Sequence, residues 1–156
     1  MAFEMRSKKK LRLVIDTNLI VAAYFNPRSA SAKILGLCER DPSFGIVYTS
    51  KMRKEADLIL RNIQASKPFG DRIKNIFDGG LGVQRIKPHR LVTEDPEDNK
   101  FLDCALSAKA DYVITNDRHM LKLKTVRDID IVRPSDFVKI LEKRNLSAYA
   151  EDHPYG

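Results

Sequence analysis

Acidic side chains occur repeatedly in this chain where an apolar, β-rich run is followed by a helical pattern. Asp16 follows the run 11–15, Asp117 follows the run 112–115, and Asp98 opens the helical pattern that precedes the second run. The carboxyl ends of parallel strands meet at one edge of a sheet, so these carboxylates are expected to converge. Crowded carboxylates repel one another, and Mg²⁺ or Mn²⁺ would relieve that repulsion through oxygen ligation. Such ions activate water and stabilise charge on a phosphate, so the pattern indicates metal-dependent phosphoryl chemistry.

Two further acids lie near the same edge, and each candidate taken alone has a simpler explanation. Glu55 lies in a strongly charged helical pattern, which is typical of a solvated side chain. Asp103 lies in an apolar helical pattern, where it would pair with a lysine or belong to the rim of the site. Asp16 or Asp98 could be a helix N-cap, because Asp caps helices well. The combined placement of the acids, and no single one of them, favours the site.

Short apolar strands separated by helices predict a parallel sheet that is covered on both faces, which is a three-layer α/β/α architecture. Ser29 and Ser50 are expected to cap helices, and Gly79-Gly80 is expected to end one. The predicted central sheet has five parallel strands, at 11–15, 45–49, 83–86, 112–115 and 129–132. The predicted helices run from the first strand to about 24, then over 29–41, 50–63, 70–77, 99–110, 120–123 and 134–143.

Length and composition favour a single domain over 11–143, with a basic arm at 1–10 and a flexible polar tail at 144–156. No apolar run is long enough to span a bilayer, and the first residues lack an apolar signal core, so we expect a cytoplasmic protein without membrane contact. Cys38 and Cys104 lack metal-site spacing and are expected to be reduced core residues. The net charge of +7 favours a polyanionic partner such as nucleic acid, although a merely soluble basic protein would explain it equally well.

Five segments, taken in order, resemble the motifs of the PIN domain, the nuclease fold of many toxin components in bacterial and archaeal toxin–antitoxin pairs (VapC-like ribonucleases). The resemblance covers about residues 11–143, and the order of the segments makes it specific. The segments are VIDTN at 14–18, Ser50 with Glu55, DPEDNKFLDCA at 95–105, ADYVITND at 110–117 and IVRPSDF at 131–137.

This resemblance implies a metal-dependent ribonuclease that hydrolyses single-stranded RNA with Mg²⁺ or Mn²⁺. It also implies a homodimer and an antitoxin protein as a partner. Relatives commonly carry a glycine where this chain has Asn116 and an aspartate where it has His119, so the rim of the metal site differs here. The implied catalytic acids are Asp16, Glu55, Asp98 and Asp117, the implied metal ligands are Asp16, Asp98, Asp117 and secondarily Asp103, and the implied polar supports are Asn18 and Thr115.

Two alternatives come from other functional classes. A receiver-type signalling module is also a parallel α/β domain, but it needs an aspartate after the third strand and a lysine after the fifth. Here Ile86 is followed by Lys87, and Val132 is followed by Arg133, so neither requirement is met. The other alternative is a nucleic-acid-binding PIN subunit with little catalysis of its own, and the intact acids argue against it.

Overall fold

The computed structural model describes the backbone of residues 10–84 and 96–152, and the side chains of 10–84 and 100–144. The rest of the predicted basic arm and the predicted strand residues 85–86 therefore lie outside the described residues. The strands are β1 (Leu11–Ile15), β2 (Phe44–Tyr48), β3 (Leu81–Gly82), β4 (Tyr112–Ile114), β5 (Thr125–Val126) and β6 (Ile129–Val132). The helices are α2 (Asn18–Phe25), α3 (Ala30–Arg40), α4 (Ser50–Asn62), α5 (Lys67–Asp78), α6 (Pro96–Ala108), α7 (Arg118–Leu121) and α8 (Pro134–Asp152).

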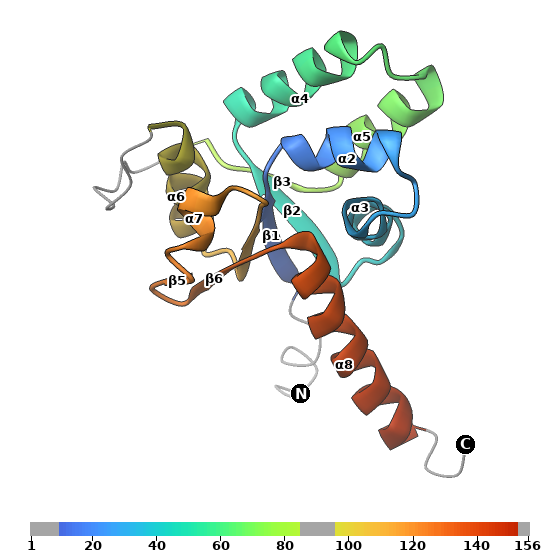
Figure 1. The fold of residues 1–156 in the computed structure, drawn as a ribbon, viewed down its shortest axis with the longest axis vertical. Helices are drawn as coiled ribbons and strands as arrows, with labels where there is room; N and C mark the ends of the chain where they lie inside the picture. Colours follow the sequence, from blue (N-terminus) through green and yellow to red (C-terminus); the bar gives the residue numbers. More distant parts are fainter. Residues whose placement is uncertain (1–9, 85–95, 153–156) are drawn as a thin grey trace.

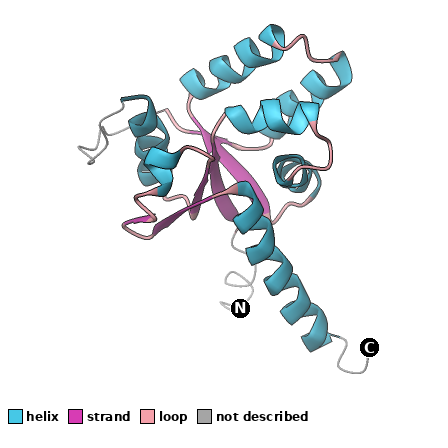
Figure 2. Ribbon diagram, in the orientation of Figure 1, coloured by secondary structure: helices cyan, strands magenta, loops and turns pink. Residues whose placement is uncertain are grey.

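The strands form one sheet in the order β3-β2-β1-β4-β6-β5, with β1 in the interior. All neighbours pair in parallel except β5, which pairs antiparallel with β6. Helices cover both faces of the sheet, as Figure 2 shows, so the expected three-layer α/β/α architecture is confirmed. Within the described residues, no helix combines the length and the apolar character needed to cross a membrane.

Alternation along the buried strands divides the apolar core between the two faces. In β1, Leu13 and Ile15 pack with α2, α3, α5 and α8, whereas Val14 packs on the opposite face with α6 and α7 (Figure 1). The same alternation places Tyr112 and Ile114 on the first face and Val113 on the second. Strands that are buried on both faces read as continuous apolar runs, because successive side chains point to opposite sides. The strands that are packed on both faces form the centre of the domain, and this packing fixes where each strand ends.

In the part of the chain that the structure describes, the sheet has six strands instead of the predicted five. Two-residue strand β5 pairs with β6, and Val126 lies opposite Ile129, so Arg127 and Asp128 form the turn between them. Arg127 has a φ of 53° and Lys124 has a φ of 57°. Residues other than Gly, Asn and Asp seldom adopt such left-handed conformations, so the sequence carries no ordinary hairpin signal here.

The third strand lies two residues before its predicted place, because Gly80 brings the chain close to β2. A Cβ atom at Gly80 would lie 2.5 Å from the Ile46 carbonyl oxygen, so only glycine permits this approach. Pairing with β2 therefore begins at Leu81, directly after α5. Gly79 is the C-cap of α5, as predicted from the Gly79-Gly80 pair.

Several helix ends differ from the prediction, and local capping explains most of the differences. Thr49, not Ser50, caps α4, because its hydroxyl accepts a hydrogen bond from the Met52 amide. Ser66 caps α5 and starts it at Lys67. The helix α8 continues to Asp152 instead of ending near 143. Ser29 caps α3 as expected.

Both cysteines are free thiols, as expected for reduced core residues. Cys104 is buried in α6 and Cys38 is partly buried in α3. Burial raises the pKa of each thiol to about 12, since the thiolate would lose its hydration. Both side chains therefore stay protonated at neutral pH and pack as small apolar groups.

Candidate active site

Asp16 and Asp117 are connected through the hydroxyl group of Thr115. Asp16 directly follows β1 and Thr115 directly follows β4, and these two strands are neighbours in the sheet with Ile15 opposite Ile114. The Thr115 hydroxyl donates to Asp16 Oδ2 at 2.8 Å and accepts from the Asp117 amide at 3.0 Å. Thr115 is completely buried, so packing fixes the position of this hydroxyl. The parallel strand ends therefore bring two acids together that lie far apart in the sequence.

The contacts of Asp16 show that it is more than a helix cap. Its side chain is only 7% exposed, and its Oδ1 accepts a hydrogen bond from the Asn18 amide at 2.9 Å. The N-cap position of α2 belongs to Thr17, whose side chain makes no capping hydrogen bond. A carboxylate oxygen has two lone pairs, and within the described residues each oxygen of Asp16 accepts one hydrogen bond, which leaves one lone pair on each for a ligand. Asn18 supports Asp16 through its backbone amide.

Asp117 has a structural role and also an available oxygen. Its Oδ1 accepts hydrogen bonds from the amides of His119 at 2.8 Å and Met120 at 3.4 Å, so it caps the short helix α7. Among the residues that the structure describes, no hydrogen bond to its Oδ2 is present. One oxygen thus positions the side chain, and the other is left for chemistry.

Glu55 reaches the same region from α4 and is held there by a lysine from α6. The Lys100 ammonium lies 2.6 Å from Glu55 Oε1, and the two side chains are only 17% and 27% exposed. The short ion pair and the partial burial of both side chains show that the Glu55 carboxylate is not freely solvated. The solvated reading of Glu55 is therefore incorrect.

These acids line one open cavity of about 350 Å³, which we call the acid cavity. Figure 1 shows α2 and α4 leaving the sheet at the edge where β1 and β2 end, which is where this cavity lies. Within the described side chains, no three His, Cys, Asp or Glu residues are close enough together to form a complete metal cage. The lining of the acid cavity consists of Asp16, Thr17, Asn18, Glu55, Leu58, Ile59, Asn62, Lys100, Phe101 and Asp117.

The remaining predicted residues lie around this cavity or outside what can be described. Asp98 lies in the first turns of α6, the helix that carries Lys100, and its side chain is outside the described residues. Asp103 is partly buried and lines a neighbouring cavity, so its role as a metal ligand stays a prediction. Asn116 and His119 are exposed and do not line the acid cavity.

Sequence reasoning assigned no role to Lys100, although the residue lies inside a motif. The signal was present as a lysine between Asp98 and Asp103, but its partner Glu55 lies 45 positions away on another helix. Leu58 was also missed, and it is 53% exposed at the rim of the acid cavity. The Glu55–Lys100 pair depends on how α4 and α6 approach each other, and local sequence patterns carry no information on the distance between two helices.

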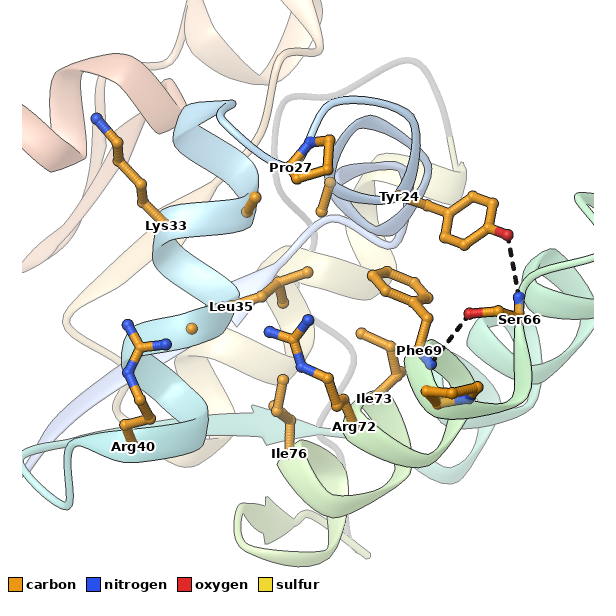
Figure 3. Close-up of a pocket in the computed structure, with 14 residues that line it drawn as sticks. Tyr24, Pro27, Lys33, Leu35, Arg40, Ser66, Phe69, Arg72, Ile73 and Ile76 are labelled. Carbon is orange, nitrogen blue, oxygen red and sulfur yellow. Dashed lines mark hydrogen bonds between the residues drawn. The ribbon is translucent and has the colours of Figure 1, made fainter.

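A different cavity, of about 480 Å³, opens between α2, α3 and α5, and we call it the helical cavity. Its floor is apolar and its rim carries Arg40 and Arg72, which project from facing helices in Figure 3. The Tyr24 hydroxyl accepts a hydrogen bond from the Ser66 amide at 3.0 Å at one end. None of the predicted acids lines it, so the helical cavity is not the candidate active site.

Comparison with known proteins identifies the family of the chain. An uncharacterized protein of Methanocaldococcus jannaschii, MJ1680, is 29% identical over 154 residues, which covers 90% of this chain and 97% of that protein. No solved structure matches the chain. The family model described as PIN domain matches residues 12–119, a stretch that begins in β1 and ends just after Asp117. The chain therefore belongs to the PIN domain family, whose members are generally nucleases.

Proposed function

We propose that this protein is a Mg²⁺- or Mn²⁺-dependent endoribonuclease that hydrolyses phosphodiester bonds of single-stranded RNA. The observation that carries the proposal is the hydrogen-bonded connection of Asp16 and Asp117 through Thr115, in one cavity with Glu55. The Asp16 carboxylate is buried and hydrogen-bonded to Thr115 at the end of β1, and a buried charge is costly unless it is paired or binds a metal ion.

The donors of the acid cavity fit a hard divalent cation. Mg²⁺ is usually held by one or two carboxylates, and it keeps several waters. Asp16 and Asp117 supply two such carboxylates, and Asp117 Oδ2 is the most available oxygen. Asp98 and Asp103 remain proposed further ligands. A divalent ion in this place would supply Lewis acidity for phosphodiester hydrolysis.

The residues of the chain have separate tasks in this proposal. Asp16 and Asp117 bind the ion, and Thr115 connects them through the Asp16 carboxylate and the Asp117 backbone amide. Asn18 orients Asp16 through its amide. Glu55 completes the negative charge of the site and positions the Lys100 ammonium at its border. No serine, cysteine or histidine nucleophile is required.

The proposal goes beyond the family assignment in two respects, namely RNA as the substrate and a toxin as the biological role. The net charge of +7 supports a polyanionic substrate, since lysine and arginine neutralise phosphates. The resemblance to toxin components supports an antitoxin partner and a homodimer. The toxin role is tested by whether expression arrests growth and whether co-expression of a small gene adjacent to this one relieves the arrest. The dimer is tested by light scattering on a sizing column.

The direct test of the activity measures cleavage of a fluorophore- and quencher-labelled single-stranded RNA. We expect cleavage with Mn²⁺ or Mg²⁺ and none in EDTA. Glu55→Gln should slow cleavage, whereas Asp57→Asn is a matched control, because Asp57 lies on the same helix, is exposed and does not line the acid cavity. Undiminished cleavage in EDTA would rule out the metal mechanism. RNA binding without cleavage under any metal would instead favour a nucleic-acid-binding subunit.

A further inference from the structure

A second open cavity, of about 560 Å³, lies beside the acid cavity. It is formed where β2 and β3 end, between the first turn of α4 and the helix α6. Its lining includes three cationic side chains, Lys51, Arg53 and Lys100, and the acid Asp103. We call it the basic cavity. Its volume lies within the range of about 300–1,000 Å³ that is common for ligand sites.

Lys100 lines both the acid cavity and the basic cavity, so the two cavities adjoin at this residue. Its ammonium is held by Glu55 at 2.6 Å, which fixes a positive charge at the border. A polyanionic chain that leaves the acid cavity on this side therefore meets a cation before it enters the basic cavity. The order along this path is carboxylates, then Lys100, then the remaining cations.

The other two cations of the basic cavity differ in how firmly they are held. Arg53 donates to Asp78 at 2.6 Å and to the Tyr48 hydroxyl at 3.4 Å, so it forms part of the wall. Its guanidinium also lies 5.9 Å from the centre of the Tyr48 ring. Lys51 is exposed, and no ion pair to it is present among the described side chains. Lys51 is therefore the cation best able to reach a ligand.

We propose that the basic cavity binds the RNA backbone next to the phosphodiester bond that is cleaved, with Lys51 contacting a phosphate of the flanking nucleotide. This subsite rests on the proposed ribonuclease function. It extends that function by giving the bound RNA a path, from the acid cavity past Lys100 into the basic cavity. Lys51 lies on the α4 side of the basic cavity and Asp103 lies on the α6 side, so the proposed phosphate contact is on the α4 side. Phosphate contacts of this kind give affinity without base specificity.

Binding is measured without cleavage, by fluorescence anisotropy of a labelled oligouridylate of about 12 nucleotides in EDTA. Lys51→Ala is compared with Lys54→Ala, its matched control, because both lysines are exposed on α4 and only Lys51 lines the basic cavity. We expect Lys51→Ala to weaken binding roughly fivefold, as for two unit charges about 4 Å apart in water. The slope of log affinity against log salt should fall in magnitude by about 0.7, and Lys54→Ala should change neither quantity.

Cleavage by the same variants with Mn²⁺ separates this inference from the proposed function. Lys51→Ala should raise KM and leave kcat nearly unchanged, because a flanking contact binds substrate and transition state alike. Lys51→Arg should restore binding. Equal binding by Lys51→Ala and Lys54→Ala would overturn the subsite even if the parent cleaves RNA. Failure of the parent to cleave would overturn the ribonuclease, and a selective binding defect of Lys51→Ala would still locate the RNA in the basic cavity.

Discussion

The acid cavity and the helical cavity differ in the elements that form them and in how their polar side chains are held. The helical cavity is larger, at about 480 Å³ against about 350 Å³, yet it is formed by the faces of three helices and its rim is cationic. The acid cavity is formed at the ends of parallel strands, where the Thr115 hydroxyl bonds to the Asp16 carboxylate and to the Asp117 backbone amide. Preorganised carboxylates arise where rigid strands end, and that difference between the two regions can be tested.

The largest effect is expected from Asp117→Asn. Asn and Asp cap helices about equally well, so α7 should keep its N-cap and stability should change by no more than about 0.5 kcal/mol. The substitution removes the charge of a proposed direct metal ligand, so the cleavage rate should fall more than about a hundredfold. That loss exceeds the one usually seen when a residue that only hydrogen-bonds to a metal ligand is changed. Metal-dependent RNA cleavage measures the loss of activity, and urea unfolding of the same sample measures the stability. A stable variant with near-parental cleavage would make Asp117 a cap and nothing more.

A smaller effect is expected from Thr115→Val, which keeps the shape of the side chain and removes the hydroxyl. Asp16 then loses a buried donor and the partly buried Asp117 amide loses its acceptor, which should cost about 1–3 kcal/mol of unfolding free energy. Metal affinity should fall by about 10- to 100-fold, as for other partners that orient ligands. Titration calorimetry with Mn²⁺ measures the affinity.

Thr115→Ser is the control for that change, because it keeps the hydroxyl and loses only a methyl group. Its metal affinity should stay close to that of the parent, while its stability falls by about 1 kcal/mol. If the serine and valine variants bind Mn²⁺ equally well, the hydroxyl does not organise the two acids.

The smallest effect is expected in the helical cavity, from Arg72→Gln. Arg72 pairs with Glu39 at 2.9 Å, and its side chain is 49% exposed. Exposed ion pairs of this kind contribute about 0–1 kcal/mol, so the melting temperature should change little. Cleavage rate and Mn²⁺ affinity should equal those of the parent. A large loss of either would show that the helical cavity takes part in the reaction and would remove the contrast between the two cavities.

Much of this architecture could be predicted from the sequence, because the buried strands are short apolar runs with Asp16 and Asp117 at their ends. The predicted strand 11–15 agrees with β1, and the caps Ser29 and Gly79 are correct. These features are local, since they depend on apolar patterning and on residues within one turn of a helix end. The site acids could be proposed for the same reason.

Features that depend on contact between distant elements could not be read in this way. The Glu55–Lys100 pair joins two helices 45 positions apart, and nothing in either helix specifies the other. The hairpin at Arg127 uses a left-handed residue without Gly or Asn, so the turn was missed. The pairing of β3 with β2 begins at Leu81, two residues before the predicted start. This start depends on the approach of Gly80 to the Ile46 carbonyl oxygen, which is a tertiary contact.

The most direct test of the central claim is the stabilisation by Mn²⁺ of the parent and of Asp16→Asn, each compared with its own melt in EDTA. A bound ion at about a hundred times its Kd adds about 2.7 kcal/mol, so the parent should melt several degrees higher with Mn²⁺. Asp16→Asn should lose most of that gain, and Asp57→Asn should keep it. If Asp16→Asn keeps the full increment, Asp16 is a structural acceptor for Asn18 and Thr115, and the acid cavity is not a metal site built on it.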